Sequence, residues 1–252
     1  MPALRHFPLC WPRALPLQLT LAGLLGLGLH VGAAHAETPI PMAVAVSAPT
    51  QLAAIDPRWS SSFEAFAAAD LKQAPQPGGV VFVGSSSIRL WNDLETSFSD
   101  QPLVIKRGFG GSQLLDCVKL VHHLVLPYQP RLVVVYAGEN DLAEGASPRD
   151  VAERFTAFVQ AVKAALPDTR IAFVSIKPSP LRSGMLPAVR EANELVRAYS
   201  QTEPWLDYID VFSSMLDDQG QPRAELFQGD RLHLNADGYA IWQRIIALHL
   251  KG

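Results

Sequence analysis

The feature that most constrains this fold is a series of five short, mostly apolar runs spread along residues 80–211. Within the runs, apolar residues follow one another instead of alternating with polar ones. Continuous apolar runs of this kind are typical of strands buried on both faces, as in a parallel sheet. We therefore predict strands at residues 80–83, 103–105, 132–136, 171–176 and 208–211.

Segments with helical periodicity separate the predicted strands. The clearest segment follows Ser147-Pro148 and carries its apolar residues on one helical face, with proline in the favoured first turn. These apolar residues are Val151, Phe155, Phe158, Val159, Val162 and Leu166. Further helices are predicted around residues 189–199 and 239–249. Because strands alternating with helices build parallel sheets covered on both sides, residues 55–252 are predicted to form one α/β domain.

The first 36 residues have the layout of a secretory signal peptide. A positively charged start without acidic residues precedes an apolar core at residues 19–31. The segment ends in Ala34-His35-Ala36, which places small residues just before the expected cleavage site. An uncleaved membrane anchor is the alternative. The core is shorter than the roughly 20 residues that a membrane span needs, which favours a cleaved signal peptide. We expect a signal peptide at 1–36, a Pro/Ala-rich tether at 37–54, and an exported protein, periplasmic or secreted, without stable membrane insertion after cleavage.

Composition and charge exclude several classes of protein. The chain is 48% hydrophobic and carries a net charge of −3, which excludes a disordered chain and a global positive field for nucleic acid. Its two cysteines, Cys10 and Cys117, cannot form a disulfide framework or a four-thiolate zinc site. Cys117 lies in an apolar helical stretch, and we expect it in the core.

Several loops that follow predicted strands carry chemically useful residues, and sites in parallel sheets form where strands end. Gly84, Ser85, Ser86 and Ser87 follow the first strand. The glycine allows a tight turn, and N–H groups at the start of a helix favour a developing oxyanion. An ordinary serine N-cap would explain the same residues. The segment is not a G-x-S-x-G elbow, because Ile88 stands at the second glycine position, and this argues against an ordinary α/β-hydrolase.

Two further loops offer hydrogen-bond donors. Residues 108–112 (GFGGS) follow the second predicted strand, and glycines let backbone N–H groups approach a ligand. A flexible turn would have the same composition. Asn140 lies in residues 138–141 (GEND) after the third strand, and its amide is a neutral donor for a carbonyl oxygen that gains charge. An Asx-turn or a helix cap is the alternative for Asn140.

Asp230 and His233 form a carboxylate–imidazole pair near the end of the chain. Their spacing lets the aspartate orient the ring and stabilise its cation. A metal site on the same two residues lacks support, because no second His or Cys pair accompanies them. In the order Ser, Gly, Asn and Asp-x-x-His, the four loops supply a nucleophile, oxyanion donors, a general base and its orienting group.

These blocks resemble those of the SGNH (GDSL-type) hydrolase and esterase-lipase family over nearly the whole predicted domain. VVFVGSSSI is similar to the family's nucleophile block, KRGFGGS to its glycine block, GEND to its Asn block and DRLHLN to its Asp-His block. The resemblance implies a flavodoxin-like three-layer α/β/α sandwich with a central parallel sheet, and serine ester hydrolysis without a metal or organic cofactor. It implies catalytic residues Ser86, Asp230 and His233, and an oxyanion hole of Ser86, Gly111 and Asn140.

The chain departs from the family pattern at two positions. Ser85 replaces the usual Asp, and Lys106 stands where the glycine block often begins with Asn. Neither departure removes a group that does chemistry. We expect an esterase that acts through an acyl-enzyme on small or acetyl esters of carbohydrates or lipids. An acyltransferase, or a non-catalytic carbohydrate-binding protein on the same fold, is the alternative.

Two features bear on the substrate. Residues 177–185 (KPSPLRSGM) follow the fourth predicted strand, and we expect this loop to overhang the cleft. Trp91 and Trp205 could stack on a sugar, although burial in the core is the commoner outcome for such residues.

Overall fold

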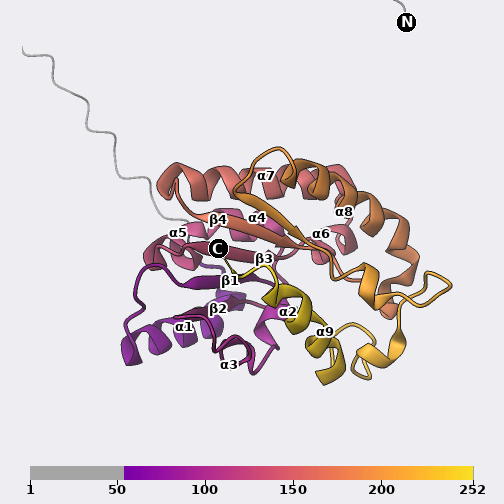
Figure 1. The fold of residues 1–252 in the computed structure, drawn as a ribbon, viewed down its shortest axis with the longest axis horizontal. Helices are drawn as coiled ribbons and strands as arrows, with labels where there is room; N and C mark the ends of the chain where they lie inside the picture. The colour runs from indigo at the N-terminus through magenta and orange to yellow at the C-terminus, as the bar shows by residue number, and fades with distance from the viewer. Residues whose placement is uncertain (1–53, 252) are drawn as a thin grey trace, which may run out of the picture. The chain divides into compact units, whose positions relative to one another are not determined.

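The computed structural model describes residues 54–251, and its centre is a five-stranded, all-parallel sheet. The predicted signal peptide, and all of the predicted tether except residue 54, lie outside these residues. The strand order β2-β1-β3-β4-β5 is the doubly wound order of flavodoxin-like folds (Figure 1). The strands are β1 Val80–Gly84, β2 Val104–Gly108, β3 Leu132–Tyr136, β4 Arg170–Val174 and β5 Leu206–Ile209. The predicted fold class is confirmed.

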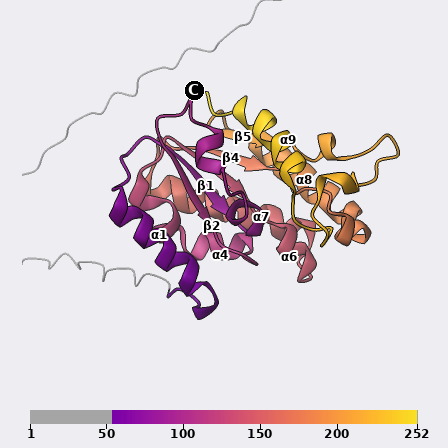
Figure 2. The ribbon, with the colours of Figure 1, turned by 90° about the horizontal axis from the view of Figure 1, so that it is seen from below.

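Helices cover both faces of the sheet (Figures 1 and 2). On one face lie α4 Leu114–Lys119, α5 Val121–Leu124, α6 Glu139–Ala143, α7 Pro148–Ala165 and α8 Leu186–Ser200. On the other lie α2 Ser86–Arg89, α3 Leu94–Ser97 and α9 Ala236–Ala247. Helix α1 Ser60–Lys72 lies beside the edge strand β2, to which an Asp70–Arg107 ion pair joins it. Short 3₁₀ helices span Pro57–Trp59, Leu126–Tyr128, Pro180–Met185, Ser213–Met215 and Ala224–Leu226.

Each central strand contributes side chains to two hydrophobic cores, one on each face of the sheet. Val81 and Val83 of β1 face the core under α7 and α8, whereas Val80 and Phe82 face the core under α9. Every residue of β1 and β3 is buried, because both faces of the sheet are covered. This double burial is the reason that these strands show no polar alternation in the sequence.

Several strand boundaries differ from the prediction, since β2 spans Val104–Gly108 instead of 103–105, and β4 and β5 begin at Arg170 and Leu206. Residues 175–176 and 210–211 do not belong to β4 and β5, so the predicted ends of these strands were wrong. The Ser175 hydroxyl accepts the N–H of Val211 at 3.0 Å and that of Phe212 at 2.9 Å. A side chain thus replaces the backbone acceptor that a continued sheet would need, and the ladder stops.

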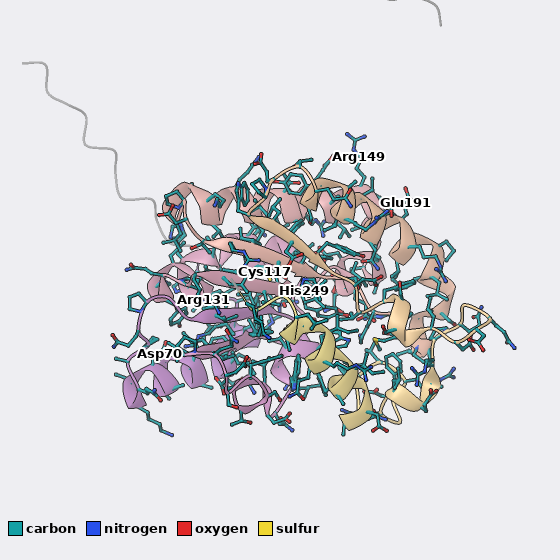
Figure 3. All side chains as sticks on the ribbon, in the orientation of Figure 1. Asp70, Cys117, Arg131, Arg149, Glu191 and His249 are labelled. Carbon is teal, nitrogen blue, oxygen red and sulfur yellow. The ribbon has the colours of Figure 1, made fainter. Side chains whose placement is uncertain are left out.

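The predicted helices and the buried cysteine are confirmed. Helix α7 begins as expected after Ser147, whose hydroxyl accepts the Asp150 N–H at 3.1 Å in a capping box. Cys117 is fully buried in α4, whereas Arg149 and Glu191 project from the surface (Figure 3). Within residues 54–251, no helix has both the length and the apolar character needed to cross a membrane.

Candidate active site

Ser86 lies at the first helical position of α2, directly beyond the carboxyl end of the central strand β1. The turn between them requires Gly84, which has φ +151° and where an added Cβ would lie 1.9 Å from the Tyr136 carbonyl oxygen. Ser85 and Ser87 are buried, at 4% and 1% exposure, whereas Ser86 is partly exposed. Of the three consecutive serines, Ser86 is therefore the one that the turn presents to solvent.

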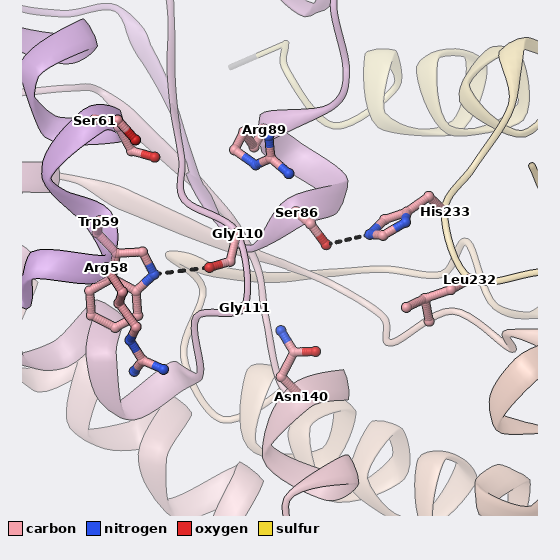
Figure 4. A pocket seen from close by; sticks show the side chains of 11 residues that line it. Arg58, Trp59, Ser61, Ser86, Arg89, Gly110, Gly111, Asn140, Leu232 and His233 are labelled. Carbon is pink, nitrogen blue, oxygen red and sulfur yellow. Dashed lines mark hydrogen bonds between the residues drawn. The ribbon is translucent and has the colours of Figure 1, made fainter. Parts of the chain in front are cut away.

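His233 lies against Ser86, although 147 residues separate them in the chain. The distance from His233 Nε2 to Ser86 Oγ is 2.9 Å (Figure 4). On the other side of the ring, His233 Nδ1 lies 2.6 Å from Asp230 Oδ2. The structure thus brings Ser86, His233 and Asp230 into one hydrogen-bonded chain. In this order, an imidazole held by a carboxylate can take the proton of a hydroxyl.

A tight backbone turn holds the Asp230 carboxylate. Its Oδ1 accepts the N–H groups of Leu232 and His233, each at 2.9 Å. Arg231, which follows Asp230 in the chain, has φ +59°. These backbone hydrogen bonds, followed by the His233 ring, lower the pKa of Asp230 to about 2. The carboxylate therefore stays ionised over the range in which an imidazole takes up or gives away a proton.

The two predicted oxyanion donors come from neighbouring loops. Gly111 has φ +74°, and a Cβ there would meet no atom within 4 Å, so its position is open on the pocket side. Asn140 lies in α6 and donates through Nδ2 to the Ser112 carbonyl at 3.0 Å. An amide nitrogen carries two hydrogens, which leaves the second one for a ligand in the pocket that Asn140 lines.

A cavity of about 480 Å³ lies in front of these groups. The candidate residues Ser86, Gly111, Asn140 and His233 all line this one cavity (Figure 4). Asp230 does not line it and is hydrogen-bonded to the His233 ring. The other lining residues are Arg58, Trp59, Ser61, Ser62, Arg89, Gly110 and Leu232. Among the described residues, no group of three His, Cys, Asp or Glu side chains gathers as a metal site would require.

Comparison with known families decides the identity. Residues 81–241 match the model of the GDSL-like Lipase/Acylhydrolase family, and this range includes every candidate residue named above. The chain belongs to the GDSL-like lipase/acylhydrolase family. The resemblance inferred from the four sequence blocks is confirmed, and membership makes this chain an ester hydrolase. No curated protein sequence matches it significantly.

Solved structures share the GDSL-like fold. A protein from Bacteroides fragilis described as an acylhydrolase aligns with a TM-score of 0.66 and 22% identity over 78% of this chain and 98% of that one. A GDSL-like lipase from Bacteroides thetaiotaomicron aligns with a TM-score of 0.61 and 20% identity over 75% of this chain and 96% of that one. A carbohydrate esterase family 3 protein from Talaromyces cellulolyticus aligns with a TM-score of 0.54 and 16% identity over 70% of this chain and 96% of that one. At these identities the likeness shows the shared fold.

The two departures from the family pattern leave the GDSL-like site intact. Ser85 acts through its backbone, since its carbonyl accepts the N–H groups of Ile88 and Arg89, each at 3.1 Å. Lys106 lies in β2, does not line the cavity in front of Ser86, and donates through Nζ to the Trp91 carbonyl at 3.0 Å. Both departures therefore affect the local support of the loops rather than the groups that line the cavity.

The loop at residues 177–185 contacts residues of the site from outside the cavity. None of its residues lines the cavity in front of Ser86, so the expectation that it overhangs this cleft was wrong. Instead, Arg182 donates to Asn140 Oδ1 at 3.1 Å, and the Leu181 N–H donates to the Arg231 carbonyl at 3.0 Å. The loop thereby contacts both the Asn140 amide and the turn that carries Asp230 and His233.

A buried charged cluster, formed by Glu139, Lys177, Ser179 and Arg182, anchors this loop. Glu139 pairs with Lys177, accepts the Ser179 hydroxyl at 2.5 Å and lies 3.4 Å from Arg182. Burial acts to raise the pKa of the Glu139 carboxyl, but the charges of Lys177 and Arg182 hold it below its ordinary value. The cluster is thus an ionised network. The sequence does not mark the contact between its two segments, because they lie about 40 residues apart.

The tryptophan in the cavity wall is not one of those singled out in the sequence. Trp91 is buried at 1% exposure, and Trp205 packs beneath Lys163 near the start of β5. Trp59 lines the cavity instead, and its Nε1 donates to the Gly110 carbonyl at 2.9 Å. No motif marks Trp59, since its contact with the glycine block crosses 51 residues.

Proposed function

We propose that this protein is a serine esterase in which Ser86 is the nucleophile, His233 the general base and Asp230 the group that orients His233. The single observation that carries the proposal is the 2.9 Å contact between Ser86 Oγ and His233 Nε2, with Asp230 on the other ring nitrogen. His233 takes the hydroxyl proton as Ser86 Oγ attacks the ester carbonyl. The alkoxide leaves with the proton from His233, and an acyl-enzyme remains.

The second half of the reaction repeats the first with water. His233 takes a proton from water, the resulting hydroxide attacks the acyl carbonyl, and Ser86 leaves with the proton. In both steps the negative charge on the carbonyl oxygen is stabilised by the N–H groups of Ser86 and Gly111 and by the amide of Asn140. Donors that are already oriented before the reaction stabilise this charge without a cost for rearrangement.

The proposed substrates are small or acetyl esters of carbohydrates or lipids. Support comes from the family, which includes lipases and acylhydrolases, and from the fold shared with a carbohydrate esterase. Support also comes from the cavity, whose volume of about 480 Å³ suits a small acyl group together with part of an alcohol.

The test is hydrolysis of 4-nitrophenyl acetate and 4-nitrophenyl octanoate by the wild type and by Ser86→Ala, His233→Ala, Ser85→Ala and Ser87→Ala. We expect the first two variants to lose at least about a thousandfold in kcat, and the two flanking serine variants to stay within about tenfold of wild type. Full activity of Ser86→Ala would overturn the nucleophile. Preference for octanoate would replace the acetyl-ester proposal with a lipase.

We further propose that the protein is exported and that residues 1–36 are removed. The supporting features are the positive start, the short apolar core and the small residues that end at Ala36. Amino-terminal sequencing of the protein from the extracytoplasmic fraction should begin at Glu37. An intact amino terminus on membrane-bound protein would instead favour a retained anchor.

A further inference from the structure

Arg89 is a cationic side chain of the cavity wall that the proposed chemistry does not use. It lies at the end of α2, three residues after Ser86, and is exposed. An added Cβ on Gly110 would lie 3.0 Å from Arg89 Nε and 3.4 Å from Nη2. The guanidinium therefore lies against the bare backbone of Gly110, beside the oxyanion donor Gly111 (Figure 4).

The charge of this cavity is not balanced by its walls. Arg58 and Arg89 both line it, and no aspartate or glutamate does. Arg58 already has carboxylates near it, at 3.5 Å from Asp56 and 3.9 Å from Asp116. Within residues 54–251, Arg89 makes no such ion pair. A guanidinium is always charged and presents a planar set of donors that matches an oxyanion such as a carboxylate or phosphate.

Arg89 also stands between two cavities. Together with Ser61 and Ser62 it lines both the cavity of Ser86 and a second one of about 340 Å³. The second cavity is bordered by apolar residues of α1, by one carboxylate and by β2; these residues are Ala65, Phe66, Ala69, Glu95, Lys106, Arg107 and Gly108. A substrate with its ester at Ser86 would therefore pass the Arg89 guanidinium before its remaining part reached the second cavity.

We propose that Arg89 is a specificity residue that binds an anionic group of the substrate, so that this enzyme prefers esters carrying a carboxylate or phosphate close to the scissile bond. The proposal rests on the proposed function, because it places the ester carbonyl at Ser86. The anionic group forms charge-assisted hydrogen bonds with Nε and Nη2, next to the Gly110–Gly111 backbone. It can belong to the acyl part or to the alcohol part of the ester.

The experiment compares kcat/KM for three chromogenic esters in the full-length protein. 4-Nitrophenyl acetate is neutral, 4-nitrophenyl hydrogen succinate carries its anion on the acyl side, and 3-carboxy-4-nitrophenyl acetate carries it on the alcohol side. The readout is the ratio of kcat/KM for each anionic ester to that for the neutral one. We expect Arg89→Gln to lower at least one of these ratios by about tenfold or more. Arg89→Lys should keep part of the preference for the anionic ester, because an ammonium retains the charge. The control Arg149→Gln, which changes an exposed arginine, should leave both ratios unchanged.

The ester whose ratio falls identifies the side of the substrate that Arg89 contacts. Ratios of Arg89→Gln within threefold of wild type for both anionic esters would overturn the proposal, as would a wild type that prefers the neutral ester to both. Loss of folding is excluded by the melting temperature, which should stay near that of wild type. Activity that survives in Ser86→Ala would overturn the proposed function, whatever the ratios measured for Arg89→Gln.

Discussion

Arg182 donates to Oδ1 of Asn140 at 3.1 Å across 42 residues of sequence. The two ends of the Asn140 amide are therefore assigned by their partners, with the oxygen held by Arg182 and the nitrogen held by the Ser112 carbonyl at 3.0 Å. Because a guanidinium only donates, it cannot pair with the amide nitrogen, and the amide cannot turn over without losing both bonds. Arg182 thus keeps the Asn140 donor available to the cavity.

Replacement of Asn140 by alanine should lower kcat by about 10²–10³ with 4-nitrophenyl acetate. The reason is that an oxyanion donor acts mainly on the transition state, in which the carbonyl oxygen is charged. Steady-state kinetics of the variant measure the effect. An Asn140→Ala enzyme with a kcat within a factor of two of wild type would contradict the proposed role.

Replacement of Arg182 by glutamine should lower kcat about tenfold and leave KM nearly unchanged. Arg182 positions Asn140 and does not line the cavity, so it should affect transition-state stabilisation more than substrate binding. Arg182→Lys should recover part of kcat, since an ammonium can still donate to Oδ1. The control is Arg197→Gln, which breaks an exposed ion pair with Glu194. A purely structural role would lower the melting temperature of Arg182→Gln without this fall in kcat.

The Asp230 turn should make stability depend on pH in the acid range. The pKa of Asp230 is lowered to about 2 in the folded protein, against about 3.9 in an unfolded chain. Its stabilising contribution is therefore fully present above pH of about 4 and is lost as the pH falls towards 2. Asp230→Asn should be less stable than wild type at pH 7. The difference in stability should shrink as the pH falls from about 4 to about 2.

Urea unfolding of both proteins at several pH values measures this difference. The exposed Asp218 supplies the control, since Asp218→Asn removes a carboxylate outside the 230–233 turn. A difference between wild type and Asp230→Asn that stayed constant from pH 7 to pH 2 would show that the carboxylate charge does not stabilise the turn.

Gly84→Ala should destabilise the domain by at least about 3 kcal/mol or prevent folding. The added Cβ would lie 1.9 Å from the Tyr136 carbonyl oxygen, between two central strands that cannot separate without breaking the sheet. Gly184→Ala is the matched control, because a Cβ there meets no atom within 4 Å. The free energy of unfolding measures both effects, and equal stabilities of the two variants would refute the argument.

Much of the fold follows from local properties of the sequence. The runs at residues 80–83 and 132–136 are buried on both faces of the sheet and show this as unbroken apolar segments. The start of α7 was predictable because Ser147 caps its own helix. The ends of β4 and β5 were not, because Ser175 stops the sheet by bonding the backbone of a segment about 36 residues away.

The sequence by itself determined the order of chemical groups, Ser86, Gly111, Asn140 and Asp230 with His233, because each follows a strand or turn with its own local signal. It also determined that a parallel sheet would bring most of these loops to one edge. Only the tertiary structure placed Ser86 against His233, and only it brought Trp59 and Arg89 to the cavity and Arg182 to Asn140. The physical reason is that these contacts depend on how separate helices and loops pack around the sheet, and such packing leaves no periodic or short-range mark in the chain.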